Sequence, residues 1–355
     1  MIRKAFKLAT TEKPGACHIE LAEDIAEKEV SGLTPIPTSR VRRPVPADKV
    51  VDQAWELIKA AKRPVILAGN GCVRKRVSKQ LRLFAEASNI GVINTFMGKG
   101  AVPRSAPYSL FTIGLQAKDV IACAIDAADL VITLGYDLVE YHPRLWNSTG
   151  DKRVIHIDFL PAEVDEHYSV EVEIVGDLAH TLWMLNERMK KEPVQFELQQ
   201  HATIREEMLD DFSAHSEDKT KGIIRPQKVL WDVREAMGPS DILLSDVGAH
   251  KMWIARYYQC DEPNTCLISN GFCSMGFALP GAIGAFIARP ESRILAICGD
   301  GGFLMNVQEM ETARRLNANI TVMIWEDHAY GLIEWKQDTK FGKHTELTFD
   351  NPDWV

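Results

Sequence analysis

The sequence predicts an α/β protein with two doubly wound parallel-sheet domains, each a three-layer α/β/α structure. Short unbroken apolar runs, of which Ile294–Cys298 is typical, are what a parallel strand buried on both faces requires. These runs alternate with stretches in which apolar residues recur every three or four positions, the period of an amphipathic helix. The length of 355 residues, of which 46% are hydrophobic, is enough for about two or three domains with a large core.

The first 30 residues are too few to form a domain. They contain an amphipathic stretch, Met1–Leu8, and an apolar run, Ala16–Leu21, which we expect to be a helix and a strand. Because a strand needs neighbours to pair with, we expect residues 1–30 to be the tail of a larger domain. Residues 31–46 are rich in proline and are expected to be a linker.

Residues 47–191 are expected to form the first doubly wound domain. Residues 192–222 are polar, with apolar residues at helical intervals, and are expected to form a surface helix that bridges the domains. The predicted helices of the domain are Val50–Ala61, Val77–Ser88, Ala117–Ala127 and Leu178–Lys190, and its predicted strands are Pro64–Ala68, Gly91–Thr95, Leu130–Leu134, Arg153–Ile157 and Val172–Val175.

Residues 223–355 are expected to form the second doubly wound domain. Its predicted elements are the helices Pro226–Met237 and Phe303–Leu316 and the strands Ile242–Ser245, Ile294–Cys298 and Ile320–Trp325, followed by a loop. Because no closing strand or helix follows that loop, we expect this domain to be incomplete and the chain to be truncated at both ends.

Composition excludes several classes of function. The net charge of −8 is the wrong sign for a protein whose main partner is a phosphate backbone, so nucleic acid is not an expected partner. No apolar run approaches the roughly 20 residues of a membrane helix, and the first residues lack the apolar core of a signal peptide. The seven scattered cysteines contain no CxxC pair, which favours reduced thiols over disulfides or a zinc site. We therefore expect a cytoplasmic protein with no membrane partner.

One βαβ unit carries acidic residues at both of its strand ends. Gly299, Asp300, Gly301 and Gly302 directly follow the strand Ile294–Cys298, and Asp327 lies two residues beyond the next strand. The crossover places both carboxyl ends at one edge of the sheet, so Asp300 and Asp327 are expected to face one crevice. Glycines there let backbone N–H groups approach a phosphate, and two carboxylates beside it suit a bridging magnesium ion. The alternative for this glycine-rich segment is a tight turn without a ligand.

This GDGGF segment, with a second acidic residue 27 positions after Asp300, resembles the signature of thiamine-diphosphate enzymes, and within them the acetolactate synthase large subunits. The resemblance implies that the side chains of Asp300 and Asp327 and the carbonyl of Ala329 hold Mg²⁺ against the cofactor diphosphate. It also assigns further residues to the cofactor site, namely Val247, Gly248, Ala249, His250, Gly271, Met275, Gly299, Gly301, Gly302, Tyr330, Gly331 and Leu332.

Two of these assignments have plain structural alternatives. By the resemblance, Met275 lies beneath the thiazolium ring and His250 contacts the diphosphate. Without it, Met275 is ordinary core packing and His250 an ordinary core or surface histidine.

The first doubly wound domain gives only a weak indication of a nucleotide site. Gly69-Asn70-Gly71 follows a strand, but Arg74 stands where a dinucleotide fingerprint has its third glycine. The stretch Tyr136–Trp146, which contains Glu140, is similar to the catabolic, flavin-independent acetolactate synthases, so FAD is not expected. Lys336 stands where biosynthetic members have a tryptophan that favours 2-ketobutyrate, which implies pyruvate as both donor and acceptor.

The resemblance implies a homodimer or homotetramer that converts two molecules of pyruvate into 2-acetolactate, in branched-chain amino acid biosynthesis or acetoin formation. The family's catalytic glutamate belongs to an N-terminal domain that this sequence does not contain, so no catalytic residue is assigned and the chain alone is expected to be inactive. The alternatives are another thiamine-diphosphate 2-oxoacid decarboxylase or carboligase, and a non-catalytic piece that only oligomerises.

Overall fold

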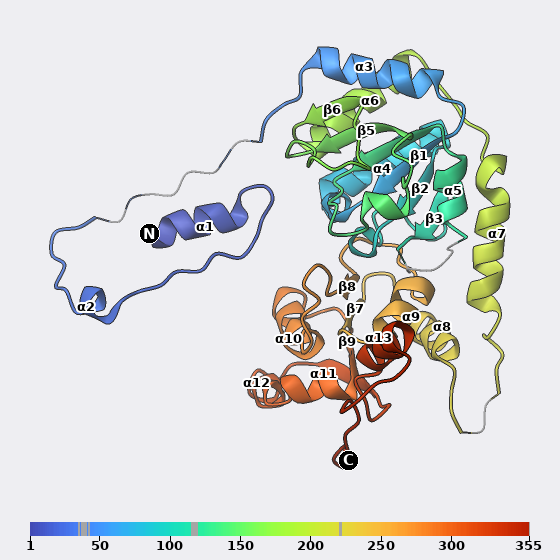
Figure 1. Ribbon diagram of the computed structural model, residues 1–355. Helices are drawn as coiled ribbons and strands as arrows, with labels where there is room; N and C mark the ends of the chain where they lie inside the picture. Colours follow the sequence, from blue (N-terminus) through green and yellow to red (C-terminus); the bar gives the residue numbers. More distant parts are fainter. Residues whose placement is uncertain (35, 37–40, 42, 115–119, 220–221, 355) are drawn as a thin grey trace.

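The computed structural model describes residues 1–34, 36, 41, 43–114, 120–219 and 222–354 and contains two parallel sheets, each flanked by helices (Figure 1). This confirms the predicted α/β class with three-layer domains. Among the described residues, no helix is long and apolar enough to cross a membrane.

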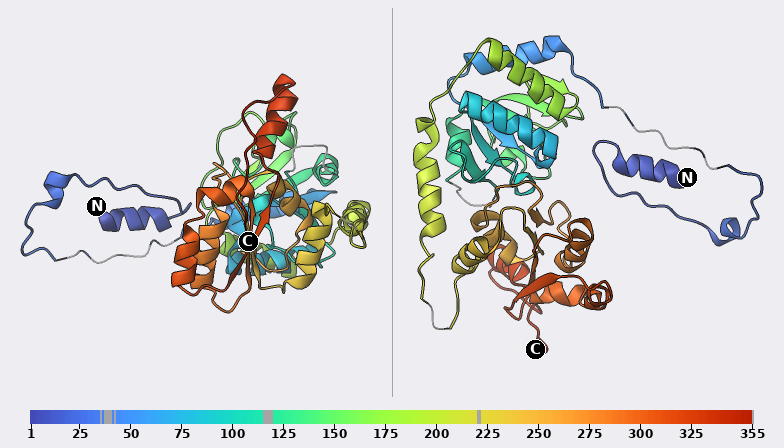
Figure 2. Two further views of the ribbon diagram at one scale, coloured as in Figure 1. Left: turned by 90° about the horizontal axis from the view of Figure 1, so that it is seen from below. Right: turned by 180° about the vertical axis from the view of Figure 1, so that it is seen from behind.

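The N-terminal segment projects away from both domains (Figure 2). It contains the helices α1 (Ile2–Thr10) and α2 (Glu23–Ala26). The predicted strand Ala16–Leu21 is wrong: these residues are exposed, and none of them belongs to a strand, because no described strand lies beside them. Ion pairs tie the segment to the first domain, including a two-pronged pair between Glu12 and Arg74 with N–O distances of 2.6 and 2.7 Å.

The first doubly wound domain, called the central domain from here on, contains a six-stranded sheet with the order β3-β2-β1-β4-β5-β6, in which every pairing is parallel. Helices α3, α4 and α6 pack on one face, and α5 and α7 on the other. The strand bounds are β1 (Pro64–Ala68), β2 (Gly91–Asn94), β3 (Ser109–Thr112), β4 (Leu130–Leu134), β5 (Arg153–Asp158) and β6 (Val172–Val175), and the helix bounds are α3 (Asp48–Ala60), α4 (Lys75–Ser88), α5 (Ala122–Ala127), α6 (Leu178–Lys191) and α7 (Gln199–Ser213).

Successive residues of β1 explain why this sheet needs helices on both faces. Ile66 packs into the core beneath α3, α4 and α6, whereas Leu67 packs into the core beneath α5 and α7. Both side chains are at most 1% exposed. Burying one such side chain stabilises the fold by roughly 1.5–3 kcal/mol. The predicted helix Ala117–Ala127 is shorter as α5, and residues 117–119 lie outside the described residues.

The C-terminal domain contains a four-stranded parallel sheet with the order β10-β9-β7-β8. Helices α8 and α9 pack on one face, and α10, α11 and α12 lie on the other. The strand bounds are β7 (Ile242–Ser245), β8 (Cys266–Ile268), β9 (Ile294–Gly299) and β10 (Ile320–Trp325), and the helix bounds are α8 (Pro226–Ala236), α9 (Ala249–Tyr257), α10 (Ala278–Ala288), α11 (Asp300–Met305), α12 (Glu309–Arg315) and α13 (Gly331–Phe341).

Two predicted elements of this domain differ from the structure. The predicted helix Phe303–Leu316 is divided into α11 and α12, because the side chain of Asn306 turns to donate a hydrogen bond to the carbonyl of Gly276 at 2.7 Å. The predicted loop after β10 contains the helix α13. The apolar residues of that helix, Leu332, Ile333, Trp335 and Phe341, do not gather on one face, so its sequence lacks the apolar period that predicts a helix.

The strand order fixes where a ligand site belongs. The chain leaves β7 towards β8 on one side and leaves β9 towards β10 on the other. Between β7 and β9 the two loops at the carboxyl ends therefore diverge, and such a switch point is the usual ligand crevice of an open parallel sheet.

Candidate functional site

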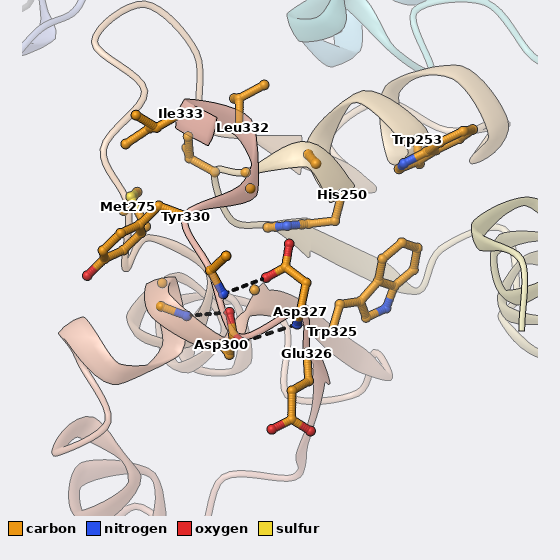
Figure 3. Close-up of a pocket in the computed structure, with 18 of the residues that line it drawn as sticks. His250, Trp253, Met275, Asp300, Trp325, Glu326, Asp327, Tyr330, Leu332 and Ile333 are labelled. Atoms are coloured by element: carbon orange, nitrogen blue, oxygen red, sulfur yellow. Dashed lines mark hydrogen bonds between the residues drawn. The ribbon is translucent and has the colours of Figure 1, made fainter. Parts of the chain in front are cut away.

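A cavity of about 400 Å³ lies at this switch point (Figure 3). Three segments at the carboxyl ends of strands line it, together with the first turns of α9, α11 and α13: residues 247–250 with Trp253, residues 299–302, and residues 325–327 with 329–333. Cys273 and Met275 complete the wall. The volume lies within the range of cofactor sites.

Asp300 is the most deeply enclosed acidic side chain of the site, with 1% of its surface exposed. Its Oδ2 accepts hydrogen bonds from the backbone N–H of His328 at 2.8 Å and from Nδ2 of Asn351 at 2.8 Å, and its Oδ1 accepts one from Gly301 N–H at 2.8 Å. Burial alone would raise the pKa of this carboxyl, but these donors more than offset burial and lower the pKa. Asp300 is thus a preorganised carboxylate.

The pKa of Asp327 shifts in the opposite direction. Burial, and then the negative charge of Asp300, raise its pKa. No lysine or arginine is among the described residues that line the cavity. A cation at this position would therefore relieve the repulsion between Asp300 and Asp327. Two carboxylates and a nearby backbone carbonyl, that of Ala329, are the hard oxygen ligands that Mg²⁺ prefers.

Glycines let the loops of the site approach each other. A Cβ on Gly301 would lie 2.8 Å from the ring of Tyr330, and a Cβ on Gly331 would lie 2.5 Å from Oδ2 of Asp327. Real Cβ atoms essentially never show such distances. The glycines predicted at these positions are therefore needed for packing, and any larger residue would push Tyr330 or Asp327 out of place.

His250 leaves one polar atom for a ligand. Its side chain is 5% exposed, and among the described residues its Nε2 has no hydrogen-bond partner. Figure 3 shows the ring next to Asp327. Burial lowers the pKa of His250 to about 4, so the ring is neutral when no anion is bound. A buried ring nitrogen without a partner is costly unless a ligand binds it, which fits a cofactor phosphate.

Asp246 holds the loop that carries Met275. Its carboxylate is completely buried and accepts hydrogen bonds from the backbone N–H groups of Val247 at 2.7 Å, Gly276 at 2.9 Å and Ala278 at 3.1 Å. The loop after β7 and the loop before α10 are thereby fixed to each other. No sequence pattern assigned this role to Asp246.

Cys273 and Lys251 form a second polar pair at the cavity wall. The ammonium of Lys251 is 3.2 Å from the sulfur of Cys273 and 3.3 Å from Oδ1 of Asn270. The Lys251 side chain is 5% exposed and lies behind Cys273, which itself lines the cavity. No sequence pattern indicates this pair, because Lys251 belongs to the helix α9 and Cys273 to the loop before α10.

The structure brings together nearly all of the residues that the sequence predicted for the site. Gly271 is the exception: it is exposed, with φ +72°, in the turn before Cys273, and is not part of the lining. Lys336, on α13, also does not line the cavity. The predicted residues that line it are Val247, Gly248, Ala249, His250, Met275, Gly299, Asp300, Gly301, Gly302, Asp327, Ala329, Tyr330, Gly331 and Leu332.

Several residues of the site were not predicted. Trp253, Cys273, Trp325, Glu326 and Ile333 line the cavity. Figure 3 shows the side chain of Glu326 extending away from the other labelled residues.

Comparison with known protein families assigns both domains. Residues 51–185 match the thiamine pyrophosphate enzyme central domain, and residues 246–355 match the thiamine pyrophosphate enzyme C-terminal TPP binding domain. Thiamine pyrophosphate is another name for thiamine diphosphate. The second match contains every residue that lines the cavity described above.

Individual relatives match along nearly the whole chain. Acetolactate synthase of Bacillus subtilis is 29% identical over all of this chain, and the catabolic acetolactate synthase of Raoultella terrigena is 32% identical over all of it. The chloroplastic acetolactate synthase 2 of Nicotiana tabacum is 31% identical over 99% of the chain. The chain spans 62%, 64% and 54% of these relatives, respectively. The chain belongs to the thiamine pyrophosphate enzyme family, of which it contains the central domain and the C-terminal cofactor-binding domain.

Proposed function

We propose that this chain carries the thiamine-diphosphate site of an acetolactate synthase, an enzyme that decarboxylates one pyruvate and joins the remaining two carbons to a second pyruvate. The observation that carries the proposal is the pair Asp300 and Asp327 at the ends of adjacent strands, in a domain that matches a TPP binding domain. Relatives matched along at least 99% of this chain are acetolactate synthases.

The metal would be Mg²⁺, held by the carboxylates of Asp300 and Asp327 and the carbonyl of Ala329. Oδ1 of Asp300 accepts a single hydrogen bond, from Gly301, and so keeps a lone pair for a cation. The metal would lie between the acidic pair and the diphosphate and offset part of their negative charge, so that they would no longer repel each other.

The remaining residues would bind and orient the cofactor. His250 Nε2 would contact the diphosphate, and Met275, fixed through the neighbouring Gly276 N–H to Asp246, would support the ring system. Thiamine diphosphate, when bound, supplies an electron sink for decarboxylation that amino-acid side chains lack. Apolar side chains of the wall, among them Leu332 and Ile333, would exclude water from it.

The carboxylates of this cavity are all committed to other tasks. Asp300 and Asp327 would hold the metal, and Glu326 accepts hydrogen bonds from Asn351 at 2.9 Å and from Trp354 at 3.2 Å. No further Asp or Glu is among the described lining residues. Activation of the cofactor by proton transfer would therefore come from outside this chain's cavity, so we expect residues 1–355 by themselves to turn over pyruvate very slowly.

The whole protein would be a cytoplasmic homodimer or homotetramer that uses pyruvate as donor and acceptor. All seven cysteines are free thiols, which fits a reducing compartment. The net charge of −8 argues against nucleic acid as a partner.

A hybrid protein tests the function. The part of the Raoultella terrigena relative that lies outside the match would be joined to this chain, and products from pyruvate would be identified by mass spectrometry. We expect 2-acetolactate, and its loss in the Asp300→Ala hybrid. A hybrid that binds the cofactor but releases only acetaldehyde would identify a simple decarboxylase and contradict the proposal.

A further inference from the structure

The central domain has a second switch point, which lies between β1 and β4. In dinucleotide-binding domains with this strand order, the diphosphate binds in that crevice, on backbone N–H groups of the glycine-rich loop after the first strand. The corresponding loop here is Gly69-Asn70-Gly71, and the loop after β4 begins with Gly135 and contains Glu140.

Each backbone N–H group of the glycine loop already donates to the protein itself. Gly69 N–H donates to the carbonyl of Leu134 at 3.0 Å, and Gly71 N–H donates to the carbonyl of Gly135 at 2.8 Å. Asn70 N–H donates to the carboxyl oxygens of Glu140 at 3.0 and 3.1 Å. None of these three donors is left for a phosphate.

The backbone after β4 fills the crevice. A Cβ on Gly69 would lie 2.4 Å from the carbonyl oxygen of Gly135, and a Cβ on Gly71 would lie 2.6 Å from the Cα of Gly135. The two loops are therefore in direct backbone contact where a dinucleotide would need space. In this domain the glycines serve the approach of one loop to the other, not the approach of a ligand.

Glu140 is the centre of this arrangement. Besides Asn70, its carboxyl accepts hydrogen bonds from the Thr95 hydroxyl at 2.5 Å and from Asp137 N–H at 3.3 Å. Thr95 follows β2, so one carboxyl group joins the loops after β1, β2 and β4. A phosphate bound to a glycine-rich loop accepts hydrogen bonds in the same way.

The arginine that follows the glycine-rich loop already has partners within the protein. Arg74, which stands at the third position of the fingerprint, forms the two-pronged ion pair with Glu12, and its guanidinium lies 4.4 Å from the ring centre of Phe159. The other charged groups near Glu140 are Asp137, which pairs with Lys13 at 3.0 Å, and Asp158. Positive charge that could attract a dinucleotide phosphate is thus neutralised within the protein.

We propose that Glu140 is the resident ligand of a former phosphate-binding loop, so that the central domain binds neither FAD nor another dinucleotide. This gives a physical reason for flavin independence in the chain's own contacts. None of the residues involved belongs to the cavity of the C-terminal domain, so the inference does not depend on the proposed function.

Amide NMR and calorimetry test the proposal. FAD and ADP would be titrated into the wild-type chain after saturation with Mg²⁺ and thiamine diphosphate, which blocks the other diphosphate site. We expect no heat, and no shift of the Gly69, Asn70 and Gly71 amide signals at millimolar ADP. Binding of FAD, or an ADP-induced shift of these three amides, would overturn the inference.

The variant Glu140→Gln tests the role of the carboxyl itself. In this variant an NH2 group, which cannot accept, replaces one of the two carboxyl oxygens that accept from the Asn70 N–H, and it faces the Asn70 or Asp137 N–H. The hydrogen exchange of the Asn70 amide should therefore accelerate by about tenfold or more. Glu171→Gln, the same change at an exposed position of the same domain, should leave that exchange rate unaltered. An unchanged Asn70 rate in Glu140→Gln would show that Glu140 is not the ligand of the loop. Should Glu140→Gln fail to fold, the wild-type titration still decides the proposal.

Discussion

Asp300 and Asp327 stand just beyond the carboxyl ends of the adjacent strands β9 and β10, and the carboxylate of Asp300 accepts a hydrogen bond from the backbone N–H of Asp327 at 3.2 Å. This contact draws the two acidic residues together. The donors around Asp300 lower its pKa, whereas burial and the charge of Asp300 raise that of Asp327. The pair is therefore strained electrostatically until a cation binds, and that requirement is the basis of the predictions for the site.

Replacing His250 by phenylalanine should weaken cofactor binding while preserving the fold. The ring is 5% exposed and its Nε2 lacks a partner, so His250→Phe keeps the buried ring and removes the atom available to the diphosphate. We expect the Kd for thiamine diphosphate to rise by about tenfold, the value of one hydrogen bond to a charged group. Calorimetry with Mg²⁺ present would measure it, and an unchanged Kd would contradict the phosphate contact.

The same contact should strengthen as the pH falls. Burial lowers the pKa of the free His250 to about 4, and the ring bonds the backbone of Asp246, so Nε2, which lacks a partner, donates to a phosphate only when the ring takes up a second proton. The ratio of wild-type to His250→Phe affinity should therefore grow as the pH falls from about 8 to 6. A constant ratio would contradict a hydrogen bond from Nε2 to the diphosphate.

Removing the Asn351 amide should weaken the metal site although Asn351 is not proposed as a ligand. Its Nδ2 donates to Oδ2 of Asp300 at 2.8 Å and helps to keep the carboxyl ionised. Loss of such a supporting hydrogen bond typically costs about 10- to 100-fold in metal affinity. Mg²⁺ titration should show this for Asn351→Ala and not for Lys343→Ala, an exposed position in the same C-terminal segment. Equal losses in both variants would indicate a general disturbance of the segment.

Bound cofactor should protect Cys273 from alkylation. Cys273 lines the cavity, and Lys251 donates a hydrogen bond to its sulfur, so a bound cofactor would cover this thiol. With thiamine diphosphate and Mg²⁺ at about 100 times Kd, reaction with iodoacetamide should slow by about 100-fold. Mass spectrometry would compare Cys273 with the exposed Cys17 and Cys123, whose rates should not change. Equal rates at Cys273 with and without cofactor would place the ligand elsewhere.

Stability should fall as the pH rises through the range in which Glu140 ionises. Burial raises the pKa of Glu140 to about 7 from 4.5, so the folded state retains this proton to a higher pH than the unfolded chain does. The free energy of unfolding should therefore decrease between pH 4.5 and about 7, by on the order of 2 kcal/mol from this group. Urea denaturation of Glu140→Gln should lack that part of the slope. An identical slope in both proteins would refute the assignment.

The sequence was sufficient wherever burial leaves a local pattern. The bounds of β4 and β7 equal the predicted ones because both are continuous apolar runs buried on two faces. The meeting of Asp300 and Asp327 followed from the rule that parallel strands share their carboxyl edge.

What could not be predicted depends on contacts that no local pattern encodes. Asn351 reaches Asp300 across 51 positions, and Lys251 meets Cys273 from the helix α9. The apolar residues of α13 do not gather on one face, so no apolar period predicts this helix. The role of Glu140 could not be predicted for the same reason, because it depends on three loops that come together only after the sheet has formed.

The central claim is that a divalent cation held by Asp300 and Asp327 binds thiamine diphosphate to this chain. Isothermal titration of the cofactor into residues 1–355, with Mg²⁺ and then with EDTA, tests it most directly. We predict binding only with Mg²⁺, weakened by about 100-fold or more in Asp300→Ala and Asp327→Ala, and unaffected in Glu291→Ala, an exposed acidic residue of the same domain. Equal affinity in EDTA, or full affinity in both site variants, would contradict the account.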